Sequence, residues 1–173
     1  ADLDSTVIKD LPPGRLRVNT AVISNEKRAD IVKRIKDACI NGRQVYWVCT
    51  LIEESEALEC EAAEVISQNL ANLLPKTRVG LIHGRMSSEE KNSVMTDFKN
   101  GDIQLLVATT VIEVGVDVPN ASLMIIENAE RLGLAQLHQL RGRVGRGSIQ
   151  SHCILLYQTP LSRDGKLRLG VMR

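Results

Sequence analysis

The sequence predicts an α/β domain built on a mainly parallel sheet, and three observations support this fold class. Its 173 residues are enough for one domain with a sizeable core. Segments such as 103–109 and 122–127 are continuously apolar, which is typical of strands covered on both faces. Amphipathic stretches of helical length separate these segments. Alternating helices and buried strands favour a parallel sheet with right-handed crossovers.

The expected strands are short runs rich in apolar and β-branched residues, bounded by polar or glycine-containing segments. The first alternates in character, and the later ones are continuously apolar. They are expected at 17–23, 44–49, 78–83, 103–109, 122–127 and 152–157.

Two of the expected helices are defined by their apolar periodicity. The first spans 25–43, with Gly42 as its C-terminal stop. Its inward face would hold Ile31, Val32, Ile35, Ala38 and Cys39. The second spans 55–75 and is ended by Pro75. Its inward face would hold Leu58, Ala62, Val65, Ile66, Leu73 and Leu74.

The third expected helix, 87–101, carries a start signal and a stop signal. Ser87 and Glu90 have the spacing of a capping box, in which each side chain accepts the other residue's backbone N–H. Gly101 would close the helix. We expect residues 1–16, with their Pro-Pro-Gly, to be an interdomain connector, 17–160 to be the domain, and 161–173 to begin a following segment.

Composition excludes several classes of function. The formal net charge of +1 means that any contact with nucleic acid must come from a local patch. Aromatic residues make up 2% of the chain, which argues against base-stacking platforms. The four cysteines form no CxxC pair and the three histidines lie at no zinc spacing, so no metal site is expected. An acidic start and the absence of a membrane-length apolar run predict a soluble cytosolic protein.

Functional residues are expected where parallel strands end. In open α/β sheets, ligands bind at the carboxyl ends of the strands. The polar groups at these positions are His83-Gly84-Arg85, Thr109-Thr110 and Glu127-Asn128. The sequence has no G-x-x-x-x-G-K-[ST] loop for phosphates and no acidic DExx cluster for magnesium. Another part of the molecule must therefore supply the phosphate cradle and the metal.

The segment LAQLHQLRGRVGRG, residues 134–147, separates into two faces when it is drawn as a helix at 100° per residue. One face holds Leu134, Leu137, Leu140 and Val144, and Arg141 falls with them, which favours a structural role for that arginine or a role on a neighbouring surface. The opposite face holds Gln139, Arg143 and Arg146 within about 60° of one another.

This polar face has two interpretations. It is a solvated basic loop, or it is a pair of guanidinium groups held in place for a phosphate, whose oxygens match the planar donor fork of arginine. The glycines between the arginines would let the backbone approach a ligand or a second domain closely. The separation into two faces favours the phosphate interpretation.

Two further segments place polar groups after strands. In 105–119, Thr109 and Thr110 follow a strand and can bind a nucleic-acid phosphate. Asp117 would either bind a ribose hydroxyl or cap the backbone locally.

In 80–91, Gly84 allows close approach of a ligand, Arg85 adds charge, and the helix beginning near Ser87 offers its N-terminal amides to an anion. We expect His83 to be a structural hydrogen-bonding residue rather than a catalyst.

With these segments in order, the chain resembles the second RecA-like lobe of a superfamily-two helicase over nearly all of its length. VYWVC resembles motif IV, IHGRMSSEEK the segment after it, and ATTVIEVGVD motif V. QLRGRVGRG resembles motif VI, whose pattern Q/H-x-x-G-R-x-G-R is filled by Gln139, Gly142, Arg143, Gly145 and Arg146. The chain departs from the DEAD-box relatives at Ser88 and Lys91, where those have Gln and Arg. The resemblance implies a RecA-like three-layer αβα domain with a mainly parallel sheet.

Within the superfamily, the finer resemblance is to the bacterial branch-migration helicases, through PPGR and YWVCTLIEES. It implies a monomeric, ATP-driven translocase on double-stranded DNA that remodels stalled forks and Holliday junctions, in the bacterial cytoplasm near the nucleoid. ATP and Mg²⁺ would be held mainly by a first RecA-like lobe. That lobe and a fork-recognising wedge domain would be partners, and no membrane is involved.

Residue roles follow from the same resemblance. Arg143 and Arg146 would act as catalytic arginine fingers, and Gln139, Gly115 and Asp117 would contribute to the ATP site, where Asp117 would contact the ribose or couple motif V to motif VI. The residues expected to contact DNA are Thr109, Thr110, Gly84, Arg85 and Lys91. On this interpretation the lobe alone is inactive.

Two alternatives remain. One is the motor lobe of a transcription-repair coupling translocase, which shares the GLAQLHQLRGRVGR region. The other is a non-catalytic interaction module of helicase shape, which would have no reason to keep Gln139 and both arginines.

Overall fold

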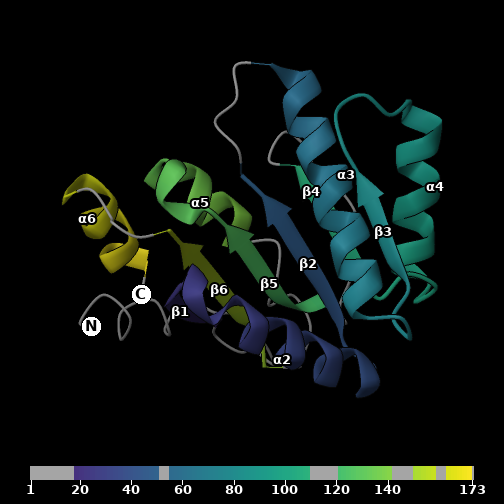
Figure 1. Ribbon diagram of the computed structural model, residues 1–173, viewed down its shortest axis with the longest axis horizontal. Coiled ribbons are helices and arrows are strands. Elements are labelled where there is room, and N and C mark those ends of the chain that lie inside the picture. Colours follow the sequence, from purple (N-terminus) through teal and green to yellow (C-terminus); the bar gives the residue numbers. More distant parts are fainter. Residues whose placement is uncertain (1–17, 51–54, 110–120, 142–149, 159–162, 173) are drawn as a thin grey trace, which may run out of the picture.

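A computed structural model of the chain describes residues 18–50, 55–109, 121–141, 150–158 and 163–172 (Figure 1). Its centre is one six-stranded sheet in the order β1-β6-β5-β2-β4-β3, in which neighbouring strands run parallel. The strands are β1 (Asn19–Ser24), β2 (Gln44–Cys49), β3 (Val79–Ile82), β4 (Leu105–Thr109), β5 (Ala121–Glu127) and β6 (His152–Tyr157). The predicted parallel α/β fold is therefore confirmed.

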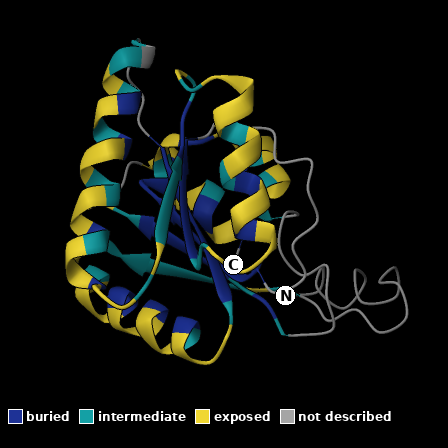
Figure 2. Ribbon diagram, turned by 90° about the vertical axis from the view of Figure 1, so that its right-hand side faces the viewer, coloured by how far each residue is buried: buried dark blue, intermediate teal, exposed yellow. Residues whose placement is uncertain are grey.

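Helices cover both faces of the sheet and make three layers. One face is covered by α2 (Arg28–Ile40) and α3 (Glu56–Leu73). The other is covered by α4 (Ser88–Lys99), α5 (Leu134–Arg141) and α6 (Arg163–Met172). Short 3₁₀ turns, η1 (Asn25–Lys27) and η2 (Ala129–Arg131), precede α2 and α5. Figure 2 shows buried strands between helices whose outer sides are exposed.

Each face of the sheet has its own apolar cluster. On the α2/α3 side, Trp47 and Ile35 are fully buried. On the α4/α5/α6 side, Phe98 lies against Tyr46 with ring centroids 4.9 Å apart. Two residues of α6, Leu169 and Met172, belong to this second cluster and are 2% and 1% exposed. The C-terminal helix therefore packs on the same core as the strands.

The predicted inward face of α3 is largely wrong. Leu58, Val65 and Leu73 are 49%, 59% and 57% exposed. The residues that face the sheet are Cys60, Ala63, Leu70 and Leu74. Two apolar stripes run along this helix, and periodicity cannot choose between them. The stripe with the smaller Cys60 and Ala63 lies against the sheet, which lets the helix pack closely on the strands. For Ile66 and Leu74 the prediction was correct, because both pack against the α2/α3 cluster.

Three predicted helix termini are confirmed. Ser87 and Glu90 form both hydrogen bonds of a capping box at the start of α4. Gly42 has a φ of +81° after α2, and Gly101 has a φ of +86° after α4. These left-handed conformations are where glycine has no steric penalty.

The part of the chain that the structure describes contains no helix long and apolar enough to cross a membrane. Over the same ranges, no three His, Cys, Asp or Glu side chains come together in a group that could hold a metal ion.

Candidate functional site

The carboxyl ends of the four strands β5, β2, β4 and β3 bring a row of polar groups to one edge of the sheet. Cys49 lies in register with Glu127 on one side and with Thr109 on the other. Ile82 is in register with Ala108, so His83 follows at the level of Thr109. The clustering of post-strand residues expected from the sequence is thus present for those that the structure describes.

An ion pair anchors the first turn of α2 at this edge. Arg28 Nε lies 3.2 Å from Glu127 Oε2, and the side chains are 27% and 11% exposed. The guanidinium also lies over the ring of Trp47, with Cζ 5.1 Å from the ring centroid. Arg28 thus ties α2 to the ends of β2 and β5. The pair could not be predicted from the sequence, because no local spacing signal links residues 99 positions apart.

Cys49 lies beside this pair, and its thiol is expected to be unreactive. Burial raises the pKa of its thiol, and the nearby carboxylate of Glu127 raises it further, against a smaller opposing effect of Arg28. Because a thiolate is the reactive form of cysteine, this thiol packs as a small apolar group.

Thr109 ends β4 and is 5% exposed. Its Oγ1 is buried and has no hydrogen-bond partner among the described residues. A buried hydroxyl without a partner costs free energy, roughly 1–3 kcal/mol, so this group has an unused capacity to bind. Thr110, the other threonine of the predicted phosphate contact, lies outside the described residues, as do Gly115 and Asp117.

The turn between β3 and α4 carries three of the predicted DNA contacts. Arg85 is exposed, Gly84 and Lys91 are partly exposed, and all three lie within the turn or the first turn of α4. His83 is 8% exposed. Its Nε2 lies 3.2 Å from Glu64 Oε1 on α3, and its Nδ1 accepts a hydrogen bond from the backbone N–H of Arg85 at 3.2 Å. This agrees with the structural role predicted for His83.

The two-faced pattern of α5 is confirmed over its described part. Leu137 is fully buried, Leu134 and Leu140 pack against the same cluster, and Gln139 is exposed on the outer side. Val144, Arg143 and Arg146 lie outside the described residues.

Arg141 turns back into the fold, as predicted. Its guanidinium donates to the carbonyl oxygen of Met172 at 3.0 Å and lies 3.5 Å from Thr20 Oγ1. It is also 3.0 Å from His138 Nδ1. Burial and then the charge of Arg141 lower the pKa of His138, which favours the neutral imidazole as hydrogen-bond acceptor. Arg141 therefore ties α5 to α6 and β1.

Thr50 is a positioning group that was not among the residues predicted from the sequence. Its hydroxyl donates to the carbonyl oxygens of Glu127 and Asn128, the second at 2.8 Å. Asn128 has a φ of 55°, the left-handed conformation that asparagine tolerates better than most residues. Thr50 thereby fixes the bend through which the chain leaves β5 towards η2 and α5. The only sequence signal for this bend is Asn128 itself, because an asparagine directly after an apolar strand is typical of a turn.

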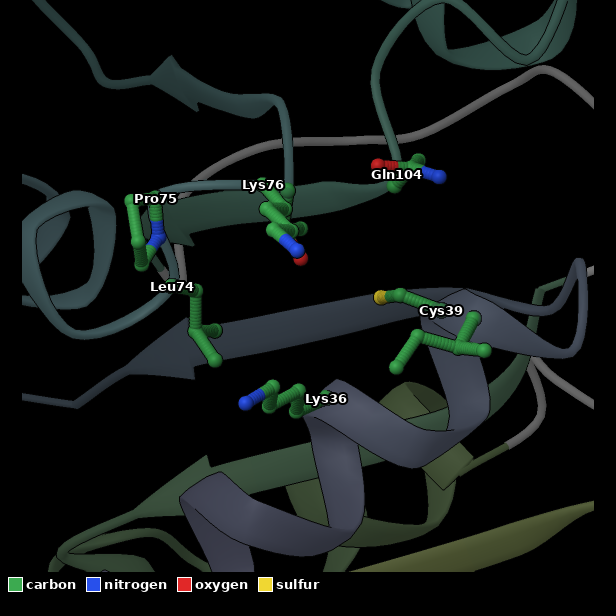
Figure 3. A pocket seen from close by; sticks show the side chains of 8 residues that line it. Lys36, Cys39, Leu74, Pro75, Lys76 and Gln104 are labelled. Carbon is green, nitrogen blue, oxygen red and sulfur yellow. The ribbon is translucent and has the colours of Figure 1, made fainter.

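A pocket of about 260 Å³ lies at the opposite, amino edge of the sheet (Figure 3). Lys36 and Cys39 lie in the last turns of α2, Leu74 to Lys76 follow α3, and Gln104 precedes β4. Burial raises the pKa of Cys39 to about 11. This pocket shares no residue with the polar row at the carboxyl edge.

The fold and the motif-bearing edge define a class of protein. The chain matches the model of the helicase conserved C-terminal domain over residues 23–148, and it belongs to that family.

Among curated proteins, it is 65% identical to the ATP-dependent DNA helicase RecG of Escherichia coli (strain K12), over 100% of this chain and 25% of that protein. It is 47% identical to RecG of Thermotoga maritima, over 90% of this chain and 20% of that protein. The chain thus spans about a quarter of the length of the RecG proteins it matches.

Solved structures agree with this assignment. A structure of RecG bound to a three-way DNA junction superposes with a TM-score of 0.78 and 40% identity, over 93% of this chain and 21% of that one. Domain 2 of the DEAD-box helicase Mss116p, bound to an RNA duplex, gives a TM-score of 0.64 over 83% of this chain. At 19% identity, that second similarity shows the shared fold alone.

Proposed function

We propose that this chain is the second motor lobe of an ATP-dependent helicase that translocates on double-stranded DNA and remodels branched junctions, in the manner of RecG. The observation that carries the proposal is the similarity to RecG along the whole chain, at 65% identity. The RecG structure with a three-way junction supports branched DNA as the substrate class. These similarities favour RecG-like function over that of a coupling translocase or a non-catalytic module.

We infer that Arg143 and Arg146 neutralise phosphate charge on a nucleotide held mainly by a first RecA-like lobe. The support is the orientation of α5, whose leucines pack inward while Gln139, which precedes both arginines in the sequence, is exposed. Guanidinium groups suit this task because their donor fork matches phosphate oxygens. Gln139, Gly115 and Asp117 would complete the nucleotide contacts from this side.

ATP with Mg²⁺ would supply the phosphoryl transfer. This chain carries neither a phosphate-cradling GKS/T loop nor a strand-terminal acidic cluster in its sequence. Its residues therefore fit the role of completing a nucleotide site, in which arginines stabilise developing charge. Closing and reopening of the cleft between lobes would change the grip of this lobe on DNA.

On the DNA side, we propose that Thr109, Thr110, Gly84, Arg85 and Lys91 hold backbone phosphates. The adjacent positions of Thr109 and the β3–α4 turn at one edge support a shared phosphate contact. Such contacts fix register and carry no base sequence, as a translocase requires. We further infer a monomer working with a wedge domain, associated with DNA in the bacterial cytoplasm.

The test is Arg146→Ala in the full-length protein, assayed for DNA-dependent ATP hydrolysis and for unwinding of a three-way junction. Loss of an arginine finger should lower kcat by about 10³-fold or more, while nucleotide binding changes little.

Arg78→Ala is the matched control. Arg78 is an exposed arginine, with a side chain 67% exposed, that precedes β3 at the amino edge and lies 4.0 Å from Asp102. This variant should keep wild-type rates. Near-wild-type hydrolysis and unwinding by Arg146→Ala would refute the finger assignment.

A further inference from the structure

We propose that His83 is a positioning residue for DNA binding: its Nδ1 accepts the backbone N–H of Arg85 and so fixes the turn that presents Gly84 and Arg85 to a DNA phosphate. The inference rests on the proposed DNA contact of this turn. It adds a residue that makes no contact with DNA itself and acts through the backbone of Arg85.

The contacts of the His83 ring determine its tautomer. The backbone N–H of Arg85 can only donate, so Nδ1 of His83, 3.2 Å away, must offer its lone pair. Nε2 is then the ring nitrogen that donates, and it lies 3.2 Å from the carboxylate oxygen Glu64 Oε1. Both contacts are satisfied together by this one form of the ring.

Packing holds the ring in place. The side chain of His83 is 11% exposed, whereas that of Glu64 is 60% exposed. The ring thus lies between α3 and the turn, with a carboxylate facing solvent on one side. At the other end of the turn, Met86 N–H donates to the carbonyl oxygen of His83 at 3.2 Å, and the backbone N–H of His83 is 3.4 Å from Met86 Sδ.

The consequence is a fixed backbone position for Arg85, from which its exposed side chain extends. The ring of His83 and the capping box of Ser87 and Glu90 hold the two ends of a short segment that contains Arg85. An exposed arginine loses conformational freedom when it binds a phosphate, and a rigid backbone reduces that cost. Removing the Nδ1 acceptor should weaken binding through Arg85 without removing any charge.

Three substitutions in the full-length protein separate this role from general packing. His83→Asn keeps an acceptor for the Arg85 N–H, because Asn accepts from the backbone N–H two residues on in an Asx-turn. His83→Leu removes both ring contacts. Glu64→Ala removes the partner of Nε2 alone and serves as the matched control.

The first measurement is the affinity for a three-way junction as a function of salt. We expect His83→Leu and Arg85→Ala each to weaken binding about tenfold. Each should also reduce the salt slope, which is the slope of the logarithm of affinity against the logarithm of salt concentration, by about one. Their double variant should be no weaker than Arg85→Ala, because both act through one contact. His83→Asn and Glu64→Ala should stay within about twofold of wild type.

The second measurement is hydrogen exchange in the peptide that contains Arg85, in the absence of DNA. Exchange of the Arg85 amide should accelerate in His83→Leu and remain slow in His83→Asn. If His83→Leu leaves both this amide and the salt slope unchanged, the positioning role is wrong. If the amide responds as expected while Arg85→Ala keeps full affinity, the DNA contact assigned to the turn fails and His83 fixes the turn for another purpose.

Discussion

At the scale of single residues, two exposed glycines have opposite effects on the backbone. Gly42 follows α2 with a φ of +81°, and an added Cβ would meet no atom within 4 Å. Any other residue at position 42 would therefore be disfavoured by its backbone conformation and not by a steric clash with neighbouring atoms. Gly170 lies within α6, and a Cβ there would also meet nothing within 4 Å. Gly170 lowers the stability of the helix because glycine has more conformational freedom in the unfolded chain, which is lost on folding.

We predict that Gly42→Ala destabilises the fold by about 1–2 kcal/mol, because a left-handed conformation is costly for an L-residue with a Cβ. Gly170→Ala should stabilise it by about 0.5–1 kcal/mol, because alanine favours the helix. Urea unfolding of both variants checks the pair. Equal signs for the two changes would contradict the conformational explanation, because both sites are sterically open.

At the scale of elements, α4 begins with a complete capping box, and its position matters because it follows the turn of His83 and Arg85. Ser87 Oγ accepts from Glu90 N–H at 3.1 Å, and Glu90 Oε1 accepts from Ser87 N–H at 3.1 Å. These bonds satisfy two of the backbone donors that a helix N-terminus leaves open.

Ser87→Ala should cost about 1 kcal/mol of the free energy of unfolding, because the Glu90 N–H loses its acceptor. Ser88→Ala, at the exposed first residue of α4, is the control and should change stability by less than about 0.5 kcal/mol. Urea unfolding measures both, and comparable losses in the two variants would show that the cap hydroxyl is not the cause.

The same box makes stability depend on pH. The backbone N–H of Ser87, followed by its side chain, lowers the pKa of Glu90. Because the pKa of Glu90 is lower in the folded than in the unfolded state, ionised Glu90 stabilises the fold at pH values above its unfolded-state pKa of about 4.3. This contribution to the free energy of unfolding is lost as the pH falls through the pKa of Glu90 in the folded state. The free energy of unfolding of the wild type should therefore decrease on acidification relative to that of Glu90→Gln, as measured by urea unfolding at several pH values. A difference between the two proteins that does not change with pH would contradict this role of Glu90.

Helices also show how far the sequence predicts local structure. For α5, leucines occupy only one side, so periodicity gave the correct inward face, and Arg141 contacts Thr20 and Met172 from that side. For α3, apolar residues occupy two stripes, and the choice depended on how closely the helix could approach the sheet. His83 was correctly expected to form structural hydrogen bonds, but its partner Glu64 lies on α3, and no sequence spacing links that helix to the turn after β3.

At the scale of the whole molecule, the parallel sheet was predictable because buried strands alternate with helices. The strand order was not, since continuously apolar strands carry no signal for their neighbours. The contacts missed at the site have the same origin. Arg28 with Glu127 and Thr50 with Asn128 join elements that become adjacent only through that order. The roles of Arg143 and Arg146 remain predictions.

The sheet lies between the two apolar clusters, and α6 packs on one of them through Leu169 and Met172, so we expect the whole domain to unfold as one unit. We predict that Leu169→Ala lowers the free energy of unfolding by about 2–5 kcal/mol, because Leu169 is 2% exposed and its loss leaves a cavity. Trp47, the single tryptophan of the chain, lies in the cluster on the other face and reports unfolding there by fluorescence.

Urea transitions followed by Trp47 fluorescence and by far-UV circular dichroism should therefore coincide, and Leu169→Ala should shift both equally. Leu167→Ala, on the exposed side of α6 with 64% exposure, is the matched control and should shift neither by more than about 0.5 kcal/mol. If Leu169→Ala moved only the dichroism signal, α6 would unfold separately from the sheet. In that case the cooperative folding unit would end near residue 160, as the sequence predicts, although α6 packs on the core.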